Sequence, residues 1–164
     1  MKYLIPYLAM LIITLPVLGK TPGKHKGAKY SFTINVQKYV HTAGITDTLF
    51  LQATLTNNTK DTLRYLNMSC SWHEIYELQG KDVSMLPWDC FNNKTRAIII
   101  WPHRSLSVNF KLLLKPVETP GKRSFTMGMH LIKAEKKDRS KYTDMITKGR
   151  LDSTNILWSN AIKL

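Results

Sequence analysis

Cys70 and Cys90 are the only cysteines in this chain of 164 residues, and they could form a disulfide or bind a metal. Softer side chains near them could add ligands for copper or zinc: Met68, His73 and Met85. The cysteines lack the Cys-x-x-Cys spacing typical of structural zinc sites, and a disulfide would consume both thiolates. We therefore expect a disulfide that encloses residues 71–89, with no metal and no cofactor, and the alternative is a soft-metal protein built on this loop.

The sequence predicts no enzyme. It contains no Gly-x-Ser-x-Gly, no His-Glu-x-x-His and no glycine-rich loop that could hold a phosphate. Glu74 and Asp89 could in principle act as a general acid and base across the loop. Both are more simply explained as solvated residues that balance a basic surface, so we expect no catalytic residues.

Aromatic residues gather in and beside the loop between the two cysteines, and this gives the chain its candidate binding site. They are Trp72, Tyr76, Trp88 and Phe91. A rigid loop that carries such rings is the kind of surface that anchors a partner. For Trp72 the competing expectation is packing over the disulfide, because an extended run would place it on the same face as Cys70.

The N-terminal segment predicts export from the cell. Lys2 is followed by an uncharged, apolar run to Gly19, and this is the layout of a secretory signal peptide over residues 1–19. The run is shorter than the roughly 20 residues that span a membrane, which favours cleavage over a retained anchor. A disulfide also suits an oxidising compartment. We expect a periplasmic or secreted protein that meets the membrane only transiently, through this signal.

The chain is strongly basic, with a net charge of +13. Residues 20–29 form a basic, flexible segment directly after the signal, and residues 133–141 hold a second basic cluster. Such charge attracts polyanions, or it simply solvates flexible segments. No aromatic residue is interleaved with the lysines of residues 20–29, so nucleic acid is not the expected partner.

Apolar and polar residues alternate with the period of a β-strand along most of the remaining chain. The runs are 30–37, 49–56, 66–72, 106–112, 125–131 and 156–164, with shorter apolar runs at 75–78 and 97–101. This pattern predicts an all-β chain, with residues 30–164 forming a single antiparallel β-sandwich of about seven to nine strands. Residues 135–155 are polar, and we expect a loop or a short helix there.

Three segments of the sequence resemble parts of bacterial immunoglobulin-like domains. Residues 55–63 are similar to a strand-turn-strand opening, residues 99–106 to the turn before a mid-domain strand, and residues 120–125 to the entry of a later strand. The resemblance implies an immunoglobulin-like sandwich, an architecture shared by adhesive, carrier and inhibitor domains. The cysteines depart from the antibody pattern, because they enclose only a local loop.

These observations together predict a non-catalytic, exported binding domain whose partner is a protein or glycan of the cell envelope. The loop of residues 70–90 is the candidate site. One alternative is an envelope protein that binds an anionic surface through its basic segments.

Overall fold

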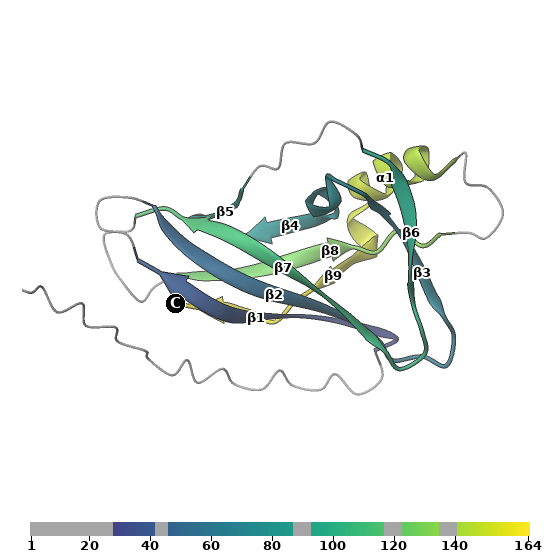
Figure 1. Cartoon of the computed structure of the whole chain (residues 1–164), viewed down its shortest axis with the longest axis horizontal. Helices are drawn as coiled ribbons and strands as arrows, with labels where there is room; N and C mark the ends of the chain where they lie inside the picture. The colour runs from purple at the N-terminus through teal and green to yellow at the C-terminus, as the bar shows by residue number, and fades with distance from the viewer. Residues whose placement is uncertain (1–27, 42–45, 87–92, 117–122, 135–140) are drawn as a thin grey trace, which may run out of the picture.

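The structure is a computed structural model that describes residues 28–41, 46–86, 93–116, 123–134 and 141–164. Within these ranges the chain is mostly β-strand, and its strands form antiparallel sheets with a β-sandwich-like arrangement (Figure 1). The all-β class expected from the alternating pattern is confirmed.

The largest sheet has the strand order β1-β2-β7-β5. Its members are β1 (Tyr30–Val40), β2 (Asp47–Asn57), β7 (Ser105–Leu114) and β5 (Val83–Met85). In β2 every second residue from Leu49 to Asn57 is buried, which is the alternation that the sequence predicts for a half-buried strand. This face of the sheet therefore forms one wall of the core.

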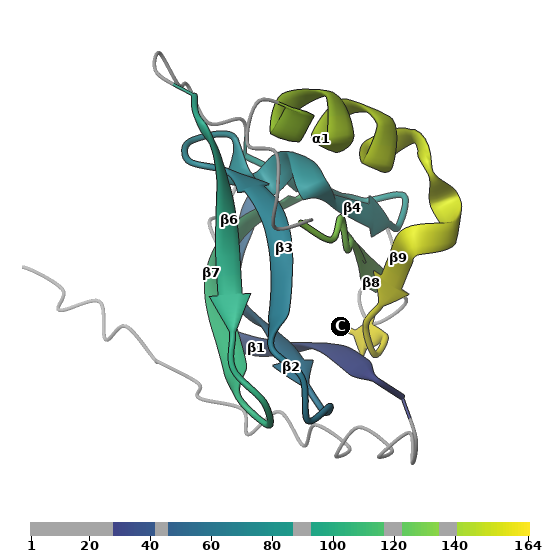
Figure 2. The ribbon, with the colours of Figure 1, turned by 90° about the vertical axis from the view of Figure 1, so that its right-hand side faces the viewer.

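The second sheet is built around β8 (Ser124–His130). It pairs with β4 (Tyr76–Gln79), β9 (Ile156–Trp158) and β10 (Ile162–Lys163). Asn160 joins this sheet to β1, because its side-chain amide accepts from the backbone nitrogen of Ile34 at 2.9 Å and donates to the Ile34 carbonyl oxygen at 3.0 Å. Figure 2 shows β8 and β9 on the side of the molecule away from β7.

A third, two-stranded sheet pairs β3 (Leu63–Met68) with β6 (Thr95–Ile100). The expected strand over 66–72 is wrong at its end, because β3 stops at Met68 and the short 3-10 helix η1 (Trp72–Ile75) follows. The side-chain oxygen of Asn93 lies 3.3 Å from the backbone nitrogens of both Cys70 and Ser71. Because the strand ends before these residues, Cys70 and Trp72 do not share a strand face.

Part of the polar stretch 135–155 is helical: α1 (Tyr142–Leu151) packs against β3 and β6. Its glycine, Gly149, lies so close to Ile132 that an added Cβ would stand 2.5 Å from the Cγ1 atom of that side chain. The 3-10 helix η3 (Ser153–Asn155) follows, and the side chain of Asp152 accepts from the backbone nitrogen of Thr154 at 2.9 Å. The alternative of a short helix is thus confirmed over this part.

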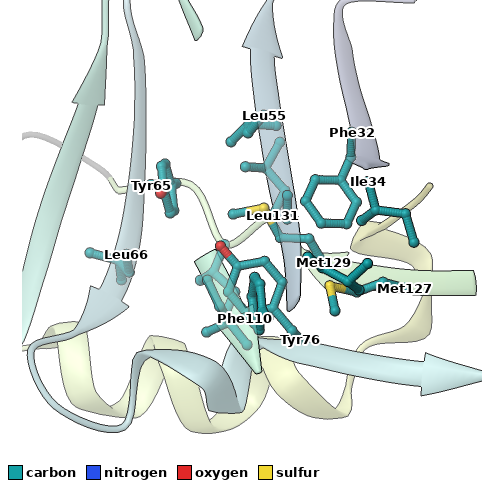
Figure 3. Close-up of a cluster of buried hydrophobic side chains, with 14 of the residues drawn as sticks. Phe32, Ile34, Leu55, Tyr65, Leu66, Tyr76, Phe110, Met127, Met129 and Leu131 are labelled. Atoms are coloured by element: carbon teal, nitrogen blue, oxygen red, sulfur yellow. The ribbon is translucent and has the colours of Figure 1, made fainter. Parts of the chain in front are cut away.

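The core lies between the sheets and is rich in aromatic rings and methionines (Figure 3). The ring of Phe110 lies 4.9 Å from that of Tyr76, centroid to centroid, in an edge-to-face arrangement. Met127 and Met129 of β8 are fully buried beside them. Within the described ranges there are ten strands, more than the seven to nine expected, because the run predicted at 156–164 is divided into β9 and β10 and the three-residue β5 lies outside the predicted runs.

Candidate functional site

Two of the four predicted binding residues contribute to the packing of the core. Tyr76 is only 6% exposed, and burial raises the pKa of its hydroxyl. Trp72 is half-buried, with its ring centroid 5.0 Å from that of Phe110 and 6.2 Å from that of Tyr76. The Tyr76 ring is therefore not available at the surface, and the Trp72 ring is engaged by these two neighbours.

The other two residues of that prediction, Trp88 and Phe91, lie outside the described residues, as does Cys90. No cysteine among the described residues is free, and the Cys70–Cys90 disulfide stays a prediction. The strand ends that lead into this loop are held together, because the backbone nitrogen of Ser69 donates to the Lys94 carbonyl oxygen at 2.8 Å.

Within the described ranges, no group of three or more His, Cys, Asp or Glu side chains is placed to hold a metal ion. One group of polar side chains contains the buried His130, whose Nε2 atom lies 3.4 Å from a carboxylate oxygen of Glu77. A second polar group joins Asp47 to Tyr39, His41 and Arg123, with 2.7 Å between Asp47 and the His41 Nδ1 atom.

Within the described part of the chain, no helix is long and apolar enough to cross a membrane.

The most exposed tryptophan among the described residues lies elsewhere, at the end of β6. Trp101 is 64% exposed, and Ile99, two residues earlier, is 42% exposed. Ile98 and Ile100 on either side pack inward, so strand alternation places Ile99 on the outer face of the two-stranded sheet. Arg64 stands directly opposite Ile99 in the ladder and shares that face.

Helix α1 covers only the other half of this outer face. The hydroxyl of Thr143, in the first turn of α1, lies 3.1 Å from the hydroxyl of Thr95, the first residue of β6. Figures 1 and 2 both show α1 beside the end of β3 and β6 that lies away from the turns to β2 and β7. The opposite end, next to those turns, carries what we call the corner face: Thr62, Arg64, Ile99 and Trp101.

A buried asparagine fixes the two turns that support the corner face. Asn57, the last residue of β2, is fully buried. Its side-chain nitrogen donates to the carbonyl oxygens of Asp61 at 2.7 Å, Ile100 at 3.2 Å and Trp101 at 3.3 Å. Its side-chain oxygen accepts from the backbone nitrogen of Thr59 at 3.1 Å. One amide therefore joins the β2–β3 turn to the β6–β7 turn.

A polar cleft of about 450 Å³ opens beside the corner face. Its lining comes from the start of β1, the start of β3 and the segment that follows β8: Tyr30, Asp61, Thr62, Leu63, Arg64, Lys133 and Ala134. The ammonium group of Lys133 lies 5.4 Å from the centre of the Tyr30 ring, at cation–π distance. Because Thr62 and Arg64 belong to both features, the cleft and the corner face are continuous.

The cleft carries a net positive charge that the described part of the protein does not neutralise. Arg64 and Lys133 supply two cations and Asp61 supplies one carboxylate, and no ion pair joins any of the three to another described residue. The site can therefore bind an anionic group beside an apolar, aromatic surface. It offers no nucleophile held by a base, and we see no catalytic arrangement in it.

One usable signal for this site is present in the sequence, although the loop prediction did not use it. Three isoleucines run directly into Trp101 and then a Pro-His-Arg turn, and in a strand that run must turn one of its faces outward.

A scan of protein-family models and a search of curated proteins both found no match to the chain.

Proposed function

We propose that this protein is an exported, non-catalytic binding domain of immunoglobulin-like type, and that it binds a protein or glycan of the cell envelope through the corner face. The signal-like N-terminus, the sandwich-like fold and the absence of a catalytic motif in the sequence support this proposal. The corner face replaces the loop of residues 70–90 as the main candidate surface.

The observation that carries the proposal is the exposure of Trp101 on a fixed support. A tryptophan that is 64% exposed leaves most of its apolar ring in water, so covering that ring on binding contributes favourably. Asn57 holds the carbonyl of the same residue from inside the fold. A rigid anchor loses little conformational freedom when it binds, and rigid aromatic anchors dominate many interfaces.

Two other surfaces compete with this one. The loop that contains Trp88 and Phe91 is the first, and it would also bind through aromatic rings. The basic segments are the second, and they would bind an anionic surface without a specific anchor. Salt separates the second from the others, because attraction between exposed charges is screened as ionic strength rises, whereas aromatic burial is not.

The test is retention of envelope components on the immobilised mature protein, compared among three single tryptophan substitutions. Trp101→Ala removes the proposed anchor, Trp88→Ala removes the loop anchor, and Trp158→Ala serves as a control because Trp158 is also exposed but belongs to β9. We expect Trp101→Ala to lose most of the retained material in both low and high salt, with the other two variants close to wild type.

Loss of retention in Trp88→Ala, with Trp101→Ala unaffected, would show that the loop of residues 70–90 is the binding surface. Equal retention by all three variants, with release of everything in high salt, would show binding through the basic segments alone. Either result overturns the corner-face proposal.

A further inference from the structure

We propose that the cleft beside the corner face is a subsite for the acidic sugar of an anionic glycan, with Arg64 and Lys133 binding the sugar carboxylate. This inference rests on the proposed function and narrows its partner from an envelope component to an acidic saccharide. It follows from the mixture of groups that line one cleft.

The two cations of the cleft are available for a ligand. The side chains of Arg64 and Lys133 come from different segments, β3 and the chain after β8, and an isolated bridge between Tyr65 and Lys133 holds these segments side by side. Neither cation has a carboxylate partner among the described residues. A planar guanidinium and an ammonium on one cleft suit a carboxylate, which Arg can bind through two parallel hydrogen bonds.

The remaining lining favours a sugar over a simple anion or a dense polyanion. Asp61 places a carboxylate in the same cleft, and it would repel a second row of phosphates, whereas it can accept hydrogen bonds from ring hydroxyls. Thr62 adds a hydroxyl group that can both donate and accept. Tyr30 adds an aromatic ring over which the Lys133 ammonium lies at 5.4 Å, so the ring holds this cation at the cleft.

Size and position agree with this assignment. A cleft of about 450 Å³ falls within the range of small-molecule sites. It is continuous with the corner face through Arg64, which lies opposite Ile99. A glycan chain that places one acidic residue in the cleft can therefore continue over the apolar surface next to it.

The test is a set of titrations of the mature protein followed by backbone amide NMR, with three small probes. Glucuronate carries both determinants, glucose carries the ring without the carboxylate, and acetate carries the carboxylate without the ring. We expect saturable shifts at the amides of Thr62, Arg64 and Lys133 with glucuronate, at concentrations roughly tenfold or more below those needed for glucose or acetate.

Charge-removing variants test whether Arg64 and Lys133 bind the carboxylate of glucuronate. Arg64→Gln and Lys133→Gln should each weaken glucuronate binding by roughly tenfold, as expected when a charged hydrogen bond is lost. Lys111→Gln is the matched control, because Lys111 is exposed on β7 and does not line the cleft. All three positions lie on the surface of the described structure or at its cleft, and thermal unfolding of each variant verifies the fold.

Several results would overturn the inference. Equal shifts with acetate and glucuronate would show adventitious anion binding only, and no saturation with glucuronate would exclude the subsite. Equal weakening by Lys111→Gln would show a general effect of net charge. These failures leave the proposed function standing if Trp101→Ala still abolishes envelope retention, and the proposed function fails separately if Trp101→Ala has no effect there.

Discussion

The side-chain nitrogen of Asn57 lies 3.3 Å from the carbonyl oxygen of Trp101, so the most deeply buried polar side chain of β2 holds the most exposed tryptophan of the described structure. The same nitrogen also bonds the carbonyl of Asp61, in the neighbouring turn, at 2.7 Å. The corner face is therefore fixed from within by a single amide, and this relationship links the stability of the fold to the geometry of the proposed site.

Removal of that amide should destabilise the protein strongly. Asn57→Ala removes the side-chain hydrogen bonds to Asp61, Ile100, Trp101 and Thr59, and each such bond contributes about 0.5–1.5 kcal/mol, so we expect the free energy of unfolding to fall by about 2–4 kcal/mol. Asn58→Ala is the matched control, because Asn58 is exposed and its side chain bonds only surface groups, Ala28 and Ser31. Urea denaturation measures both, and equal losses in the two variants would contradict the role assigned to Asn57.

Truncation to alanine should lower the stability of the protein strongly at Trp72 and hardly at all at Trp101. Trp72→Ala removes a ring that packs on Phe110 and should cost about 3–5 kcal/mol of stability, whereas Trp101→Ala should change it by about 0.5 kcal/mol or less. Chemical denaturation of both variants checks this contrast. A strongly destabilised Trp101→Ala variant would mean that Trp101 supports the fold and that its loss of binding has a structural cause.

The docking of α1 should depend on the lack of a side chain at Gly149. Alanine is the better helix former by about 1 kcal/mol, yet Gly149→Ala places a Cβ 2.5 Å from Ile132, and we expect a net loss of about 1–3 kcal/mol. Lys148→Ala changes an exposed position of the same helix and should be nearly neutral. Thermal unfolding compares the two. If Gly149→Ala is more stable than wild type, α1 is not held against Ile132 as closely as the structure indicates.

Buried tyrosines should make the protein unstable in alkali. Burial raises the pKa of Tyr65 to about 12 and also raises that of Tyr76, whereas an unfolded tyrosine titrates near pH 10. The unfolded chain thus loses these protons first, so the contribution to stability is complete below about pH 10 and falls as pH rises toward the folded pKa, by about 1.4 kcal/mol per pH unit for each tyrosine.

Urea denaturation at about pH 9 and about pH 11.5 measures this loss, on either side of the ordinary tyrosine pKa. Tyr65→Phe removes one of the two buried titrating tyrosines and should reduce the slope. A slope that is unchanged in Tyr65→Phe would show that other groups cause the alkaline instability.

The long strands could be predicted from the sequence because their environment is regular. β2 and β7 each have one buried and one outer face, so the alternation of side chains records their position directly. The residue at which β3 ends could not be predicted from this alternation. Asn93, more than twenty residues further along the chain, bonds the backbone of Cys70 and Ser71, and no local pattern in 66–72 carries that information.

The candidate site was harder to predict than the fold, for a related reason. Aromatic residues signal both cores and interfaces, and Tyr76, a candidate binding residue by sequence, is buried against Phe110. The exposure of Trp101 depends on how far α1 reaches along β3 and β6. That distance is set by tertiary packing between segments remote in sequence, such as Gly149 and Ile132.

Binding of partners at the corner face can be tested on the wild-type protein by oxidative footprinting of its four tryptophans. The rate of side-chain oxidation is measured by mass spectrometry with and without the envelope fraction that the protein retains. We expect oxidation of Trp101 to slow several-fold on binding and oxidation of Trp158 to stay unchanged. Protection of Trp88 with no change at Trp101 would contradict binding at the corner face.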